Sequence, residues 1–176
     1  MQKSELGRAI YEISNIRGEF VLRSGQAVNE YFDKYLFESR PDILVAVADH
    51  MSQMLPSSFD KLAGLEMGGI PIATALSLAT GIPVLFVRKE AKAHGTCKIV
   101  EGGDFEGKEL VIIEDVVTTG GVIMDAVNEL RQGGAFISQV CCVIDREHEG
   151  RNNLENMGLT FMPLFTTSEL KIAAGV

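Results

Sequence analysis

Apolar residues recur along this chain in short continuous runs that alternate with longer segments of helical periodicity. The runs are rich in Val, Ile and Leu, as expected of buried strands, and they cover residues 61–66, 83–87, 109–114, 136–144 and 159–165. Continuous apolar strands separated by helices are typical of a parallel sheet covered on both faces. The pattern therefore predicts an α/β fold with a central, mostly parallel sheet flanked by helices.

The helical segments are marked by apolar residues three or four positions apart and by Pro and Gly at their ends. They are predicted over residues 6–16, 41–54, from the turn that contains Pro71 to about Gly81, 121–132 and 168–173. In the helix over 121–132, Val122, Ala126, Val127 and Leu130 are expected to face inward. Near the N-terminus, residues 20–25 and 31–33 read as short strands around a turn. A length of 176 residues fits a single domain.

Composition narrows the class of protein. Hydrophobic residues make up 46% of the chain, enough to fill a core, and the formal net charge is -8. An acidic chain argues against nucleic acid as a partner, because a nucleic-acid surface needs a basic stripe. No apolar run is long enough to span a membrane, and no signal peptide is visible, so we expect a cytoplasmic protein without a membrane partner. The odd count of 3 Cys fits a reducing compartment.

The most informative segment is residues 111–121, where an apolar run ends in Glu114 and Asp115. Small residues, two Thr and the pair Gly120 and Gly121 follow before a helical pattern begins. Glycines let a backbone approach a phosphate closely, and the amides at a helix start point toward it. The two acids would repel a bare phosphate, so we expect them to face vicinal ribose hydroxyls, with Mg²⁺ nearby. The alternative is an ordinary strand-to-helix turn with a Thr cap.

A second candidate lies in the segment 88–108, which is polar, rich in Gly and without a period. A loop of this length in a compact domain is usually functional or mobile. Its cations Arg88, Lys89 and Lys92, with His94, could clamp a departing anion such as pyrophosphate. A solvated charge run is the alternative, and the segment alone does not decide between the two.

Taken together, these segments resemble a known family. Residues 111–121 resemble the phosphoribosyl pyrophosphate (PRPP) motif of type I phosphoribosyltransferases, and Arg-Lys-x-x-Lys-x-His-Gly over 88–95 resembles the loop of the orotate phosphoribosyltransferases. Further matches are residues 20–25, 68–71 and 144–147. The resemblance implies the type I phosphoribosyltransferase fold, with a small N-terminal hood of about residues 1–40 packed on a core of about 41–176. It also implies a homodimer in which loop 88–108 is shared between subunits.

The resemblance also implies a role for each matching residue. Glu114 and Asp115 would bind the ribose hydroxyls of PRPP and hold Mg²⁺ indirectly, through those hydroxyls or water. Contacts to PRPP are further implied for Arg23, Arg88, Lys89, Lys92, His94, Val116, Val117, Thr118, Thr119, Gly120 and Gly121. Lys92, His94 and Asp115 would be the catalytic residues. Orotate would be bound by Thr118 and by Arg146, whose guanidinium suits a carboxylate.

Two positions depart from the family pattern. Many members carry Lys where this chain has Arg23, which keeps the charge, and a Lys in the pyrophosphate loop where this chain has Gly68, which does not. One pyrophosphate contact is therefore missing or replaced. Arg146 also has an alternative role, as a surface residue paired with Asp145 or Glu147.

The expected function is transfer of ribose 5-phosphate from PRPP to orotate, giving orotidine 5′-monophosphate and pyrophosphate in pyrimidine synthesis. Two other functions share the opening motif. One is a phosphoribosyltransferase for a purine or for uracil, against which only the loop and Arg146 argue. The other is a regulatory protein that senses PRPP, against which the net charge of -8 argues.

Overall fold

A central sheet of six strands organises the molecule, which we describe from a computed structural model covering residues 1–21, 25, 27–89 and 99–176. Its order is β5-β4-β3-β6-β7-β8, and every described pairing is parallel except that of β4 with the short β5. The strands are β3 Lys61–Leu65, β4 Val84–Val87, β5 Val100–Glu101, β6 Glu109–Val117, β7 Phe136–Asp145 and β8 Thr160–Thr166. The predicted α/β class and mostly parallel sheet are confirmed.

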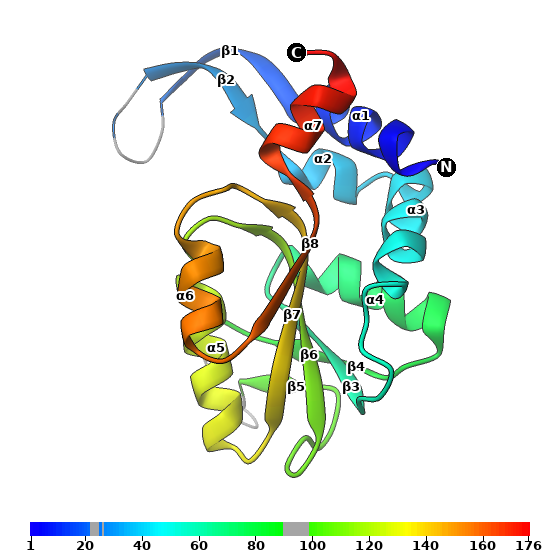
Figure 1. Ribbon diagram of the computed structural model, residues 1–176, viewed down its shortest axis with the longest axis vertical. Coiled ribbons are helices and arrows are strands. Elements are labelled where there is room, and N and C mark those ends of the chain that lie inside the picture. Colours follow the sequence, from blue (N-terminus) through cyan, green and yellow to red (C-terminus); the bar gives the residue numbers. More distant parts are fainter. Residues whose placement is uncertain (22–24, 26, 90–98) are drawn as a thin grey trace.

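Helices cover both faces of the sheet (Figure 1). α3 (Pro41–Ser52) and α4 (Gly69–Thr80) lie on one face, and α5 (Gly121–Gln132) and α6 (Gly150–Asn156) lie on the other. The central strand β6 shows why its run had to be continuously apolar. Val111 and Ile113 pack into the core on the α3 and α4 side, while Leu110 and Ile112 pack into the core on the α5 side. A side-chain period of two therefore feeds two separate cores.

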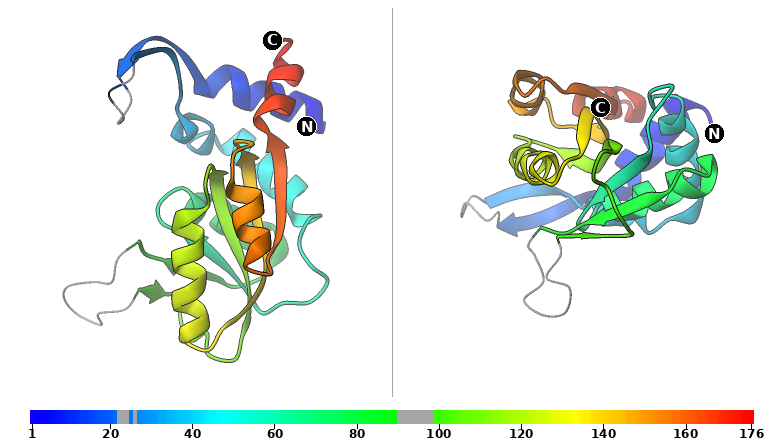
Figure 2. Two further views of the ribbon diagram at one scale, coloured as in Figure 1. Left: turned by 60° about the vertical axis from the view of Figure 1, so that its left-hand side comes forward. Right: turned by 90° about the horizontal axis from the view of Figure 1, so that it is seen from below.

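A second group of elements lies over the carboxyl ends of the strands (Figures 1 and 2). It comprises α1 (Lys3–Ser14), the antiparallel strands β1 (Asn15–Val21) and β2 (Ala27–Phe32), the short α2 (Lys34–Glu38) and the C-terminal α7 (Thr167–Ala174). In α1, Leu6 and Ile10 are fully buried, and Gly7 lies against Phe165 and Ala173. The C-terminal helix thus packs with the N-terminal segment. The division into a hood of about 1–40 and a core of about 41–176 stays a prediction.

Several local expectations were wrong. The strand predicted over 109–114 continues to Val117, so Asp115 lies within β6 and not after it. Val122 is exposed and Ile123 is buried in its place, because Ile123 has the i, i+3, i+4, i+7 spacing with the other buried residues of α5, Ala126, Val127 and Leu130. The segment predicted to be irregular contains β5, and α2 and α6 were not predicted, since helices of 5 and 7 residues are too short to establish a period. Within the described ranges, no helix is long and apolar enough to cross a membrane.

Candidate active site

Strand β6 carries Glu114 and Asp115 toward the carboxyl end of the sheet, where α2 lies. Both are buried, Glu114 at 8% exposure and Asp115 at 0%. The backbone N–H of Asp115 donates to Oε1 of Glu114 at 2.9 Å. The Asp115 carboxylate accepts the N–H of Val116 through Oδ1, and its Oδ2 lies 2.5 Å from Nζ of Lys34 in α2. The two acids therefore form the floor of the site and are held by protein groups.

Burial and charge set the protonation of this cluster. Burial, followed by the charge of Asp115, raises the pKa of Glu114 well above its ordinary value. Burial, followed by a hydrogen bond with Asp115 and then by its charge, raises the pKa of Glu38 in α2 to about 9. Burial also acts to raise the pKa of Asp115, but hydrogen bonding from Glu114, Lys34 and Glu38 outweighs it, and the pKa is lowered. The pKa of Lys34 is raised because Asp115 outweighs the opposing effect of burial. Asp115 is thus the carboxylate of the cluster that stays ionised at neutral pH.

The turn between β6 and α5 presents its amides because its carbonyls are held elsewhere. The carbonyl oxygen of Val117 accepts from the N–H of Arg146 at 2.9 Å, that of Thr118 from the N–H of Gly150 at 3.0 Å, and that of Thr119 from Nδ2 of Asn153 at 3.0 Å. Three successive carbonyls therefore point toward the β7–α6 segment. The first amides of α5 have no partner within the helix, so the turn has the geometry of an anion cradle.

Glycine at position 120 is required by this geometry. Gly120 adopts φ 77° at the N-cap of α5, a conformation that other residues rarely adopt, and a side chain there would press on Leu154 of α6. Thr118 and Thr119 are exposed, with their hydroxyls at the turn. One cavity gathers all the residues predicted for the sugar and its phosphate, and its lining is Lys34, Glu66 and residues 114–123.

Arg88 and Lys89 lie beside this cavity, at the end of β4. Nε of Arg88 lies 3.5 Å from Oε1 of Glu101, and its Nη1 lies 4.0 Å from Oε2 of Glu66. Both cations line a neighbouring cavity that shares Glu66 with the first. Arg23, Lys92 and His94 fall outside the described residues.

Arg146 lies in a third cavity, between the end of β7 and the hood. Its guanidinium carbon lies 5.3 Å from the centre of the Phe32 ring, a cation–π contact with β2. Tyr31, Asn15 and Lys171 also line this cavity. Arg146 therefore points toward β2, and its backbone N–H donates to the carbonyl oxygen of Val117 in the turn between β6 and α5. One residue thus touches both parts of the predicted site.

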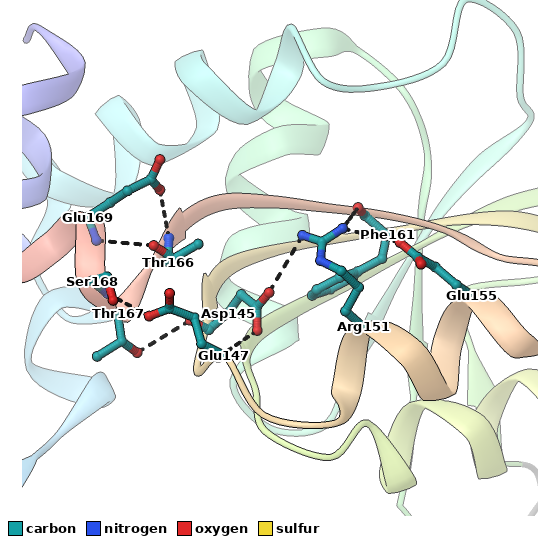
Figure 3. Close-up of polar contacts among 9 residues, drawn as sticks. All are labelled: Asp145, Glu147, Arg151, Glu155, Phe161, Thr166, Thr167, Ser168 and Glu169. Carbon is teal, nitrogen blue, oxygen red and sulfur yellow. Dashed lines mark hydrogen bonds and ion pairs between the residues drawn. The ribbon is translucent and has the colours of Figure 1, made fainter.

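The acids that flank Arg146 are engaged with other groups (Figure 3). Asp145 pairs with Arg151 at 3.6 Å and accepts the backbone N–H of Glu147 at 2.9 Å. Glu147, at φ 59°, accepts the N–H of Ser168 at 2.7 Å and so holds the start of α7. The contacts described for these acids do not support the alternative in which Arg146 is a surface partner of Asp145 or Glu147.

Two residues of the cluster were missed by the sequence analysis, Lys34 and Glu38. Both come from α2, and their spacing of four places them on one face of the helix. Glu38 is 6% exposed although it carries a carboxyl group. The available signal was weak: Asp33 caps α2 by accepting the N–H of Tyr35 at 3.1 Å, and a cap of this kind precedes many surface helices.

Comparison with known proteins identifies the family. The phosphoribosyl transferase domain model matches residues 25–157. An orotate phosphoribosyltransferase of Nocardioides sp. is 49% identical over 168 residues, which cover 96% of this chain and 94% of that protein, and one of Pyrococcus horikoshii is 43% identical, with 90% and 87% covered. A crystal structure of Mycobacterium tuberculosis orotate phosphoribosyltransferase superposes with a TM-score of 0.87 at 27% identity, covering 96% of this chain and 98% of that one. The chain therefore belongs to the phosphoribosyltransferase family, within the group of the orotate phosphoribosyltransferases.

Proposed function

We propose that this protein transfers ribose 5-phosphate from PRPP to N1 of orotate, with orotidine 5′-monophosphate and pyrophosphate as products. The observation that carries the proposal is the turn at 117–121, whose first three carbonyls are held by the β7–α6 segment while the first amides of α5 have no acceptor within the helix and lie beside a buried, ionised carboxylate. A phosphate and the hydroxyls of one sugar fit these two neighbours. Membership of the orotate group of the family supports the choice of base.

In this mechanism, the residues of the chain position charge and exclude water, and none serves as a covalent nucleophile. Thr118 to Gly121 cradle the 5′-phosphate, and Asp115 accepts the ribose hydroxyls. Arg146 pairs with the orotate carboxylate under the hood. The transition state is oxocarbenium-like, with negative charge growing on pyrophosphate, so cations at that end stabilise it. Arg88 and Lys89, together with Lys92 and His94 of the loop, are assigned to that task.

Mg²⁺ fits the chemistry of the donor set in an indirect role. Among the described residues, no group of three or more His, Cys, Asp or Glu could hold a metal ion. The carboxylates of Glu114 and Asp115 instead suit the hydroxyls of a sugar or the water shell of a hard cation. When bound with PRPP, Mg²⁺ would neutralise part of the diphosphate charge.

A homodimer is part of the proposal, because a loop that acts in the neighbouring site requires a second copy. An apolar groove between α3 and α4 supports it. The groove is lined by Leu44, Val45, Ile70, Ala75 and Leu78, and the side chain of Leu78 is 84% exposed. Exposed apolar surface of this kind marks protein contacts. A cytoplasmic location, expected from the sequence, stays a prediction.

The test is the loss of orotate absorbance when PRPP and Mg²⁺ are added, with uracil, hypoxanthine and adenine assayed in parallel. Of the four bases, orotate is expected to be the only one that is turned over. Turnover with another base would favour a different phosphoribosyltransferase, and PRPP binding without any turnover would favour a sensor. Lys92→Ala should lower turnover severely while the fold stays intact, and Asp115→Asn should weaken PRPP binding.

A further inference from the structure

One oxygen atom joins three separate elements at the floor of the site. Oδ2 of Asp115 lies 2.5 Å from Nζ of Lys34, so α2 of the hood reaches β6. The same oxygen stands against Gly68, in the turn between β3 and α4, where a Cβ atom would overlap it. A side chain at position 68 has no room while the Lys34–Asp115 pair is in place. The glycine and the lysine are therefore parts of one arrangement.

Although the proposed donor is an anion, acids predominate among the charged residues that line the cavity beside this arrangement. Of the described residues that line it, Lys34 is the single cation, and Glu66, Glu114 and Asp115 are acids. The proposed donor carries a 5′-phosphate and a diphosphate. The first amides of α5 serve one anionic group, but the ionised Asp115 opposes the other unless a positive charge faces it. The Lys34 side chain is 32% exposed, whereas that of Asp115 is 1% exposed, so the lysine is the member of the pair that reaches the cavity.

We propose that Lys34 binds the diphosphate of the donor directly, in place of a side chain that position 68 cannot carry. The inference rests on the proposed function. It assigns to the hood a cation that the pyrophosphate turn of this chain lacks, since residues 67–69 are Met, Gly and Gly. Lys34 thereby couples the placement of the hood to the binding of PRPP.

The chemistry of an ammonium group allows both contacts. It carries three N–H donors, of which one suffices for Asp115, so donors remain for diphosphate oxygens. The four-carbon stem moves while its helix stays fixed. α2 is anchored by the Asp33 cap at its start and by buried Phe37 and Glu38 at its end. Lys34 thus has a flexible, positively charged side chain on an anchored helix, and it lines a cavity that also carries acids.

The experiment compares Lys34→Met and Lys34→Arg with the wild type by calorimetric titration with two probes, inorganic pyrophosphate with Mg²⁺ and ribose 5-phosphate. Lys3→Met is the matched control, because it removes the same charge from an exposed residue of α1 whose ammonium, like that of Lys34, lies 5.2 Å from the centre of an aromatic ring. We expect Lys34→Met to weaken pyrophosphate binding by about tenfold, the loss of one charge-assisted contact, and to change ribose 5-phosphate binding by less than about twofold. Lys34→Arg should restore most of the affinity, and Lys3→Met should bind both probes as the wild type does.

An effect transmitted through Asp115 would look similar, so the same change is made in the Asp115→Asn background. If Lys34 touches the diphosphate, Lys34→Met still weakens pyrophosphate binding there. No further weakening in that background would overturn the proposal, as would equal losses for both probes or unchanged pyrophosphate affinity in a folded Lys34→Met. Turnover of orotate by the wild type is measured first. Its absence counts against the proposed function, whereas unchanged pyrophosphate binding by an active Lys34→Met counts against Lys34 alone.

Discussion

Gly68 lies directly against the carboxylate of Asp115, so closely that a single methyl group on Gly68 would overlap Oδ2. Asp115 sits on β6 between two packed cores and cannot retreat, because its neighbours Ile113 and Val117 are buried. Room for a side chain at 68 would have to come from rotation of the acid or from a shift of the turn. The position of Asp115, the acid proposed to bind the ribose, therefore depends on a residue with no side chain.

Gly68→Ala is expected to lower kcat/KM for PRPP by about a hundredfold or more, since displacement of Asp115 removes both its hydroxyl contacts and its pair with Lys34. Gly18→Ala is the matched control, because its Cβ would meet only the ring of Phe20 at 3.3 Å. Steady-state kinetics with PRPP varied at saturating orotate would make the measurement. Wild-type kinetics in Gly68→Ala would mean that Asp115 adjusts without loss.

The hydrogen bond that holds the turn at 117–121 to α6 leads to a second prediction. Asn153 donates through Nδ2 to the carbonyl oxygen of Thr119 at 3.0 Å. Without this bond, the peptide between Thr119 and Gly120 is free to turn, and its amide no longer stays directed at the phosphate. Asn153→Ala should weaken ribose 5-phosphate binding by about three- to tenfold, in line with the loss of one neutral hydrogen bond. Asn152→Ala, at an exposed position of the same helix, should bind normally, and equal affinities in the two variants would argue against this role of the hydrogen bond.

The core elements were predictable because each carries its own local signal. β6 has an unbroken apolar run that feeds two cores, and α5 begins after Gly120 and ends before Gly133, so its bounds match the prediction. The turn at 117–121 was predictable for the same reason, since its residue types follow one another in the chain. What could not be predicted was how its carbonyls are held, because that depends on α6, which is too short to show a period.

The Lys34–Asp115 pair is a contact that the sequence could not predict. The two residues are far apart in the chain, and neither the charge of Lys34 nor its short helix distinguishes it from a surface lysine. Only the folding of the hood over β6 brings the ammonium to the acid. Arg146 is an intermediate case, because its position after β7 was expected whereas its contact with Phe32 was not.

Arg146 provides the third prediction, which concerns the base. Its guanidinium lies over Phe32 in the cavity under the hood, and its own side chain does not touch the turn at 117–121 in the described contacts. Arg146→Ala should raise KM for orotate by about tenfold or more, through the loss of a charge-assisted pair, with a much smaller effect on KM for PRPP. Arg146→Lys should recover only part of the affinity, because an ammonium lacks the bidentate fork. An equal rise in both KM values would indicate that Arg146 supports the turn and not the base.

The buried carboxyl of Glu38 makes stability depend on pH. Burial and the nearby Asp115 raise its pKa from 4.5 to about 9, so the folded protein holds a proton that the unfolded chain releases. This contribution to stability is fully present below about pH 4.5 and is lost as the pH rises toward 9, with a slope of at most about 1.4 kcal/mol per pH unit. Glu38→Gln removes the titration and keeps the shape. From pH 5 to pH 9, the free energy of unfolding of the wild type should therefore fall relative to that of Glu38→Gln. Urea unfolding at pH 5, 7 and 9 makes the comparison. Glu12→Gln, on the exposed side of α1, is the control, and parallel pH profiles for wild type and Glu38→Gln would refute the assignment.

The apolar groove between α3 and α4 gives the last prediction. Leu78 is 84% exposed and Val45 is 59% exposed, which is unfavourable for a lone chain in water and favourable at the centre of an interface. Leu78→Asp places a charge there, and burying it against a second copy would cost several kcal/mol, so the equilibrium should shift to monomers. Sedimentation velocity over a range of concentrations measures the shift. Because loop 88–108 is assigned to the neighbouring site, turnover should fall with the dimer fraction and recover at high protein concentration. Ile172→Asp changes another strongly exposed apolar residue, on α7 at 76% exposure, and should leave both the oligomeric state and the turnover unchanged. A monomeric Leu78→Asp with full activity would show that each chain completes its own site.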